Sequence, residues 1–141
     1  APPPGIQMLD GPTRETCTLR RPRTNTPLQA LLLLNDETQV EAARSLAAAV
    51  LRAERGGGDA ALLRALFLRV TQRPPDPVET GLLGTLLGRL RDRYAAEPAA
   101  AERLTAVGSA PAGRDLDPRE LAPWTAVAQA VLNLDEVVTR R

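Results

Sequence analysis

Two short phrases near opposite ends of the sequence carry side chains that could bind a hard cation. They read LLNDE, residues 33–37, and LNLDE, residues 132–136. Carboxylate and amide oxygens are the ligands that Ca²⁺ prefers, so converging phrases could form a calcium site, although their spacing is not that of an EF-hand. The candidate ligands are Asn35, Asp36, Asn133, Asp135 and Glu136. The favoured alternative is structural, because such residues near helix ends commonly cap the helix or face solvent.

A second candidate site is a cluster of arginines followed by two small polar residues. This ligand-binding candidate consists of Arg20, Arg21, Arg23, Thr24 and Asn25, and the arginines could contact phosphate. However, 18 basic against 17 acidic residues give a net charge of +1, so no basic field would steer nucleic acid to the chain. Nucleic-acid binding is therefore not expected, and the favoured alternative is that the arginines bind carboxylates of the protein or remain solvated.

The residue types that most often perform catalysis are scarce in this sequence. Histidine and lysine are absent, which excludes His-dependent triads, His-ligated zinc, a C-x-x-C-H haem attachment and Schiff-base chemistry within the chain. The single Cys17 has no histidine to activate it and no internal disulfide partner. We therefore expect neither a cofactor in this chain nor catalysis by this chain alone, with Ca²⁺ kept as the alternative.

The composition favours a helical fold that could position these residues. Hydrophobic residues make up 43% of the 141 residues but aromatics only 2%, so the core must consist mainly of Leu, Val and Ala. No apolar run approaches the ~20 residues of a membrane span. We predict an all-α fold of five or six short helices, packed as an orthogonal or irregular bundle. An extended Pro-rich arm, residues 1–23, precedes a single helical domain, residues 24–141.

Helix starts are the clearest local signals. Three segments combine a capping side chain, a proline at the first helical position and a capping-box partner: residues 26–29, 76–79 and 117–120. Helices are expected at about 27–34, from 37 to the Gly56–Gly58 break, from an Asp59 cap to Pro74, from 77, from 98 to near 108, and at about 118–134. Pro123 offers an alternative start for the last helix.

Two further residue patterns have two interpretations each. Gly81, Gly84 and Gly88 share one stripe of the helix that starts at Pro77, and close backbone packing is slightly favoured over an unconstrained surface. Trp124 is more consistent with a core anchor than with a stacking platform.

We expect the arm, residues 1–23, to be held extended by its prolines and to need a surface to lie on. Its start lacks a methionine or signal pattern, which indicates a processed or excised piece.

The ends of the sequence carry a family resemblance. The stretches MLDGPTRETCTLRRPRTNTPLQALLLLND, residues 8–36, and WTAVAQAVLNLDE, residues 124–136, are distinctive, whereas the middle is generic Leu/Ala/Arg helix. The chain resembles the C-terminal part of a planctomycete-type domain of unknown function, which follows a planctomycetal cytochrome-c-like domain in large exported proteins. The resemblance implies a periplasmic or extracellular location, haem in an upstream domain, and upstream domains or another protein as partners. It transfers no catalytic residues.

Overall fold

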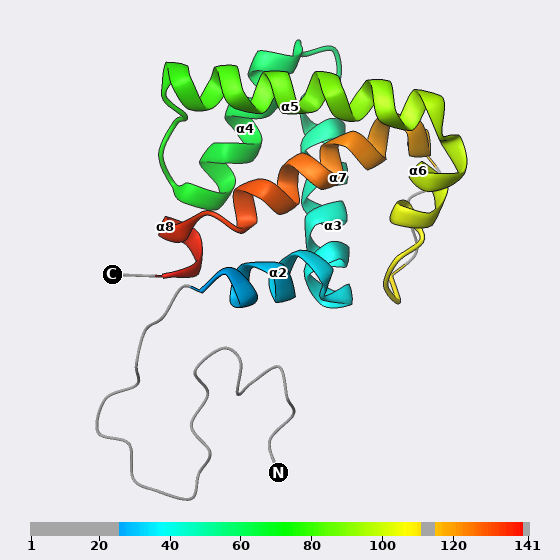
Figure 1. Ribbon diagram of the computed structural model, residues 1–141. Coiled ribbons are helices and arrows are strands. Elements are labelled where there is room, and N and C mark those ends of the chain that lie inside the picture. Colours follow the sequence, from blue (N-terminus) through cyan, green and yellow to red (C-terminus); the bar gives the residue numbers. More distant parts are fainter. Residues whose placement is uncertain (1–25, 111–114, 140–141) are drawn as a thin grey trace, which may run out of the picture.

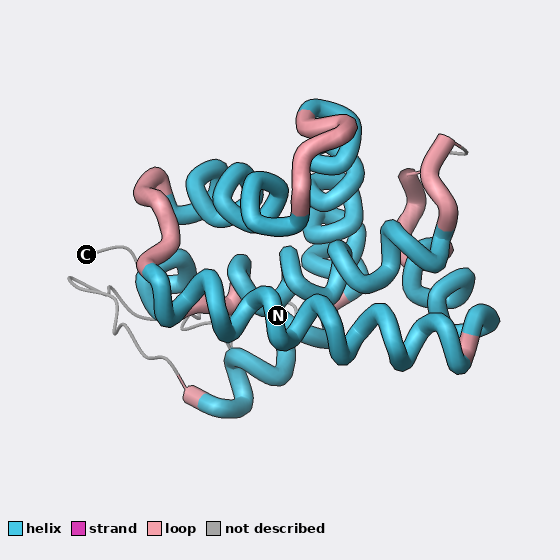
Figure 2. Tube along the Cα trace, turned by 90° about the horizontal axis from the view of Figure 1, so that it is seen from above, coloured by secondary structure: helices cyan, strands magenta, loops and turns pink. Residues whose placement is uncertain are grey.

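The computed structural model describes residues 26–110 and 115–139, and all regular secondary structure in these ranges is helical (Figure 2). The helices are α2 (Pro27–Asn35), α3 (Glu37–Ala53), α4 (Asp59–Thr71), α5 (Pro77–Ala96), α6 (Pro98–Thr105), α7 (Pro118–Leu132) and α8 (Asp135–Val138). The all-α prediction is confirmed for these residues. The helix additional to the expected five or six is α8, a single turn just beyond the predicted end of the last helix near residue 134. The Pro-rich arm, residues 1–23, lies outside the described residues.

Helix α7 is at the centre of the hydrophobic core. It packs against α3, α5 and α6, and α3 runs across the direction of α5 and α7 in Figure 1. Trp124 is fully buried, as the sequence predicted for a core anchor. The largest side chains around it in the core come from α3, α4 and α5: Val50, Leu63, Leu66, Phe67 and Leu87. One cluster of Leu, Val, Ala and two aromatic residues therefore joins four helices.

The predicted capping chemistry is confirmed at the starts of α2 and α5. Thr26 and Gln29 form a reciprocal capping box, and so do Asp76 and Glu79. At α7 the Asp117 carboxylate does cap the helix, accepting a hydrogen bond from the backbone N–H of Arg119 at 2.8 Å. No capping box completes this third start, because the predicted partner Glu120 instead binds Arg91 and Trp124.

Two predicted helix starts differ from the observed ones. Gly58, not Asp59, is the N-cap of α4, and it makes no side-chain cap. Asp59 lies in the first turn, where its carboxylate pairs with Arg91. The alternative start of the last helix at Pro123 is also wrong, because α7 begins at Pro118 and includes Pro123 as a buried residue. Pro123 removes only one backbone donor, and burial of its ring contributes to the core.

The expected close packing at the glycine stripe of α5 is wrong for the part of the chain that the structure describes. A side-chain carbon placed at Gly81, Gly84 or Gly88 would meet no atom within 4 Å apart from the backbone of α5 itself and the adjacent residues. The stripe is therefore open surface, consistent with the alternative interpretation. None of the described helices is both long and apolar enough to cross a membrane.

Candidate functional site

The two cation-binding phrases are brought to the same side of the domain by α2 and α7. The Gln129 side-chain amide donates a hydrogen bond to the carbonyl of Leu34, 95 residues away, at 3.1 Å. The Asn133 amide donates to the carbonyl of Ala30 at 3.3 Å. Side chains near the C-terminal end of α7 therefore hold α2 through its backbone. The helices that carry the two phrases, α2 and α7, therefore do meet, as the calcium hypothesis requires.

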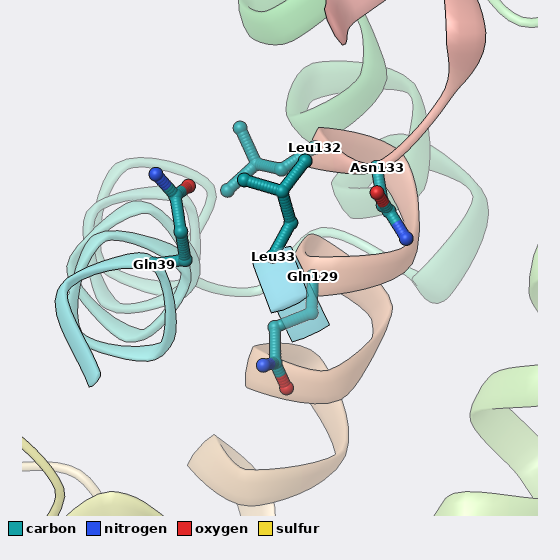
Figure 3. Close-up of a pocket in the computed structure, with 5 residues that line it drawn as sticks. All are labelled: Leu33, Gln39, Gln129, Leu132 and Asn133. Carbon is teal, nitrogen blue, oxygen red and sulfur yellow. The ribbon is translucent and has the colours of Figure 1, made fainter. Parts of the chain in front are cut away.

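A small hollow lies where these helices meet. Its lining residues are Leu33, Gln39, Gln129, Leu132 and Asn133. Its empty space of about 200 Å³ includes open solvent, so the hollow is shallow. In Figure 3 the two leucines occupy the middle and the three amides point in different directions around them. The hollow is thus apolar with an amide rim, and it contains no carboxylate in its lining.

The polar residues of the first phrase are used at helix ends. The Asn35 amide donates to the carbonyl of Leu31 at 2.7 Å. Asp36 ends α2 and also caps α3, its carboxylate accepting from the backbone N–H of Gln39 at 3.1 Å. Asp36 is therefore both the C-cap of α2 and the N-cap of α3.

The polar residues of the second phrase face different neighbours. Asn133 ends α7 and reaches α2, while the Asp135 carboxylate accepts a hydrogen bond from the Thr139 hydroxyl at 3.0 Å within α8. Glu136 pairs with Arg73 at 2.7 Å, away from the first phrase. In the described ranges, no group of three or more His, Cys, Asp or Glu side chains is placed to hold a metal ion. Calcium binding by these five residues stays a prediction.

Arg73 is the centre of an ion-pair network at the edge of the domain. It binds Glu79 as well as Glu136, both at 2.7 Å, and its guanidinium lies 4.9 Å from the centre of the Phe67 ring. The Arg73 guanidinium, together with the backbone N–H of Asp76, lowers the pKa of Glu79 to about 2. The hydrogen bonds from Arg73 to Glu79 and, to a lesser extent, to Glu136 raise the pKa of Arg73. This network joins α8 to the connection between α4 and α5.

Arg91 and Arg52 form similar ion pairs elsewhere on the surface. Arg91 binds Asp59 and Glu120, which raises the pKa of Arg91, and Glu120 also accepts a hydrogen bond from the Trp124 indole at 3.1 Å. Arg52 binds Asp115 at 2.7 Å and lowers the pKa of that carboxyl to about 2. The charged groups thus connect helices and loops across the surface of the domain.

Arg44 of α3 is a charged residue that the sequence analysis did not single out. It is buried, and its guanidinium donates to the carbonyls of Thr105 and Ala110 at 2.5 and 2.6 Å. One turn earlier, Glu41 accepts from the backbone N–H groups of Ser109 and Ala110. Arg44 therefore binds the C-terminal end of α6, where a cation is favourable.

A signal for this arrangement was present in the sequence. Position 44 lies between Val40, Ala43 and Ala47 on the apolar stripe of α3, so a buried arginine needs polar partners from elsewhere. Gly108 completes the contact, because its φ of +96° suits glycine and any side chain there would clash with Glu41. The partners themselves are backbone atoms about sixty residues away, which no spacing rule identifies.

The other predicted ligand-binding residues, Arg20, Arg21, Arg23, Thr24 and Asn25, lie outside the described residues. Their role therefore stays a prediction.

The described part of the chain is thus a helical domain in which ionisable side chains join helices and the hollow between α2 and α7 is small and apolar. A family model described as PSD1, protein of unknown function (DUF1553), matches residues 1–87. The match covers more than half of the 141 residues, and the chain belongs to this family. It includes the Pro-rich arm and α2 to α4 and ends within α5. No curated protein and no solved structure was found to match the chain.

Proposed function

We propose that this chain is a noncatalytic helical module that serves structure or interaction in a larger exported protein. In this proposal the larger protein is of the planctomycete type, works in the periplasm or outside the cell, and carries an upstream cytochrome-c-like domain that binds the haem. The distinctive stretches at residues 8–36 and 124–136 support it through their resemblance. Membership of a family of unknown function is consistent with it.

The proposal that the module is noncatalytic rests on the carboxyl groups that are held in ion pairs and helix caps. The pKa values of Glu79, Asp115 and Asp117 are all lowered by arginine pairs or helix-cap hydrogen bonds. Such carboxyls stay ionised at neutral pH, whereas a general acid needs a pKa near the working pH. Their partners hold neighbouring helices and loops together, which favours a structural role over proton transfer.

The interaction part rests on apolar side chains left in solvent. On α5, Val78 is 68% and Leu82 67% exposed, beside the open stripe of Gly81, Gly84 and Gly88. Each glycine costs helix stability, about 1 kcal/mol relative to alanine, and the described residues make no use of the space that it leaves. A surface that accepts a neighbouring domain on α5 accounts for both features.

The decisive experiment compares the chain alone with the longer protein. In a Cys17→Ser background, Leu82→Cys should react with a thiol reagent about tenfold more slowly in the longer protein, because a docked domain hinders access. Ala99→Cys, on the exposed surface of α6, is the control and should react equally in both. Equal rates for Leu82→Cys in both proteins would contradict docking on α5. A coding sequence upstream of Ala1 without C-x-x-C-H would contradict the cytochrome association.

A second candidate function is binding of Ca²⁺ or another ligand as part of a larger enzyme. The meeting of α2 with the end of α7 favours it, because Asn35, Asp36 and Asn133 belong to the elements that meet. Titration calorimetry with Ca²⁺, and thermal unfolding with and without a chelator, test the metal version. Bound Ca²⁺ would raise the unfolding temperature, with Asn133→Ala reducing the increase. Absence of both heat and a temperature shift would exclude it.

A further inference from the structure

The outer face of α2 is an apolar surface that no described residue covers fully. Leu28, Leu31 and Leu34 are spaced three residues apart and are 57%, 56% and 41% exposed. Although all residues of α2 are described, only Gln29 among them is buried. The helix contains no charged side chain that would make this face favourable in water. An occupant of this face must therefore be apolar and uncharged.

A second protein molecule is a poor fit for such a small face. A stable interface between separate chains uses roughly 20–30 residues on each side, and this stripe has three leucines. A segment tethered to α2 needs far less contact area, because a short linker holds it near the helix at an effective concentration of about 1 mM or more. The size of the face therefore favours a segment of the same chain.

The start of the chain has the required composition. Residues 1–9 read APPPGIQML and contain no charged side chain, whereas residues 10–25 contain Asp10, Arg14, Glu15, Arg20, Arg21 and Arg23. The apolar side chains Ile6, Met8 and Leu9 are within a four-residue stretch, which suits a three-leucine stripe. Prolines at 2, 3 and 4 restrict the unbound chain, so docking costs less conformational entropy.

The connection is also long enough. Residues 10–25 can span at most roughly 55 Å when fully extended, since each residue covers about 3.3–3.6 Å. The nine residues of α2 extend about 14 Å at 1.5 Å per residue. The segment can therefore return to any point on the leucine stripe.

We propose that residues 5–9 lie across Leu28, Leu31 and Leu34, so that the Pro-rich arm docks on α2 of its own chain. This docking would give the Pro-rich arm the surface that the sequence analysis predicts it to need. The inference is independent of the proposed function, because it concerns α2 in the chain alone, whereas the upstream partner was assigned to α5.

Paired cysteines test the docking directly in the full chain. With Cys17→Ser as background, Met8→Cys combined with Leu31→Cys should form an intramolecular disulfide on mild oxidation. The control pairs Met8→Cys with Leu82→Cys, whose site is 67% exposed and belongs to α5. We expect at least about tenfold more intramolecular disulfide in the first pair, because tethering near its partner raises the effective concentration. Equal yields, or disulfide-linked dimers in the first pair, would overturn the proposal.

A second measurement does not require a disulfide to form. Leu31→Cys should react with a thiol reagent several-fold faster when Met8→Asp and Leu9→Asp place charges opposite the leucines, since burying an unpaired charge is unfavourable. Leu82→Cys should show no change with the same two substitutions. An unchanged rate at position 31 would overturn the docking, and so would protection of position 31 only in a longer protein.

Discussion

Helices α7 and α2 carry the two distinctive stretches of the sequence, and they bury their side chains in opposite ways. From Leu121 to Ala128, α7 buries all but one of its residues, with Trp124 fully enclosed. All residues of α2 are described, yet it buries only the polar Gln29 and exposes Leu28, Leu31 and Leu34. The more leucine-rich helix is thus the less buried one.

The position of each helix in the fold explains the difference. In Figure 1, α7 passes between other helices, packing on α3, α5 and α6, whereas α2 lies at the edge, against α3 and the end of α7. Burial therefore depends on how many sides of a helix are covered. The comparison implies that similar truncations in the two helices should have very different effects on stability.

The largest expected effect is at the centre of α7. Trp124→Ala should reduce the free energy of unfolding by about 3–5 kcal/mol, because it leaves a cavity in the core and removes the indole donor to Glu120. Urea unfolding followed by circular dichroism measures the change. A loss below about 1 kcal/mol would mean that α7 is not the core element that its burial indicates.

The next largest effect is expected at Arg44, on the helix that packs most extensively against α7. Arg44→Met keeps much of the side-chain volume but leaves the carbonyls of Thr105 and Ala110 without their charged donor. The expected cost is about 2–3 kcal/mol. Urea unfolding measures the loss, and hydrogen exchange at Ser109 should accelerate as the loop loosens. Arg44→Lys should recover part of the stability; a fully stable Arg44→Met variant would contradict the role assigned to the guanidinium.

Local structure was predictable from this sequence because it depends on near neighbours. Caps such as Thr26 with Gln29 and stripes such as Val40 with Ala43 and Ala47 are encoded within a few residues. By contrast, the exposure of Leu31 and the burial of Arg44 depend on elements 60 to 100 residues away. A periodic pattern identifies the apolar face of a helix but not what covers it.

The candidate site was predictable to a similar extent. The sequence identified the end of α2 and the end of α7, which the fold joins through the hydrogen bonds from Gln129 to Leu34 and from Asn133 to Ala30. It could not show that Glu136 faces Arg73, because the short helix α8 turns the second phrase away from the first.

Acidification should loosen the edges of the domain, where ion pairs rather than buried apolar side chains join the elements. The folded-state pKa values of Glu79 and Asp115 are both about 2, below the ordinary values of 4.5 and 3.8. On lowering the pH the unfolded chain therefore takes up these protons first. The stabilisation is fully present above about pH 5 and is lost as the pH falls towards 2.

Chemical unfolding at several pH values from 7 to 2 measures this loss. The double variant Glu79→Gln with Asp115→Asn should be less stable at pH 7 and should depend less on pH below 5. An unaltered pH profile in the variant would show that these two pairs contribute nothing to acid sensitivity.

A gain in stability is expected on the open face of α5. Gly84→Ala should stabilise the domain by about 0.5–1 kcal/mol, because alanine restricts the unfolded chain and its methyl group meets no atom within 4 Å. Thermal and urea unfolding measure the gain. Gly108→Ala is the contrasting control: it should destabilise the domain, since a side chain at 108 clashes with Glu41 and φ is +96°. A loss of stability in Gly84→Ala would indicate a neighbour on this face.

The smallest effect is expected on α2 and gives the closest test of the comparison with α7. In the Met8→Asp, Leu9→Asp background, in which the arm does not dock on α2, Leu31→Gln should change the free energy of unfolding by only about 0.5 kcal/mol, since the side chain is then 56% exposed and glutamine retains helix propensity. Val127→Thr in α7, a similarly conservative exchange at a fully buried position, should cost clearly more, because it buries a hydroxyl among apolar side chains. Urea unfolding of both variants under one set of conditions compares them directly. Equal costs would mean that α2 is as firmly held in the fold as α7, and that exposure of its leucines does not reflect a marginal position.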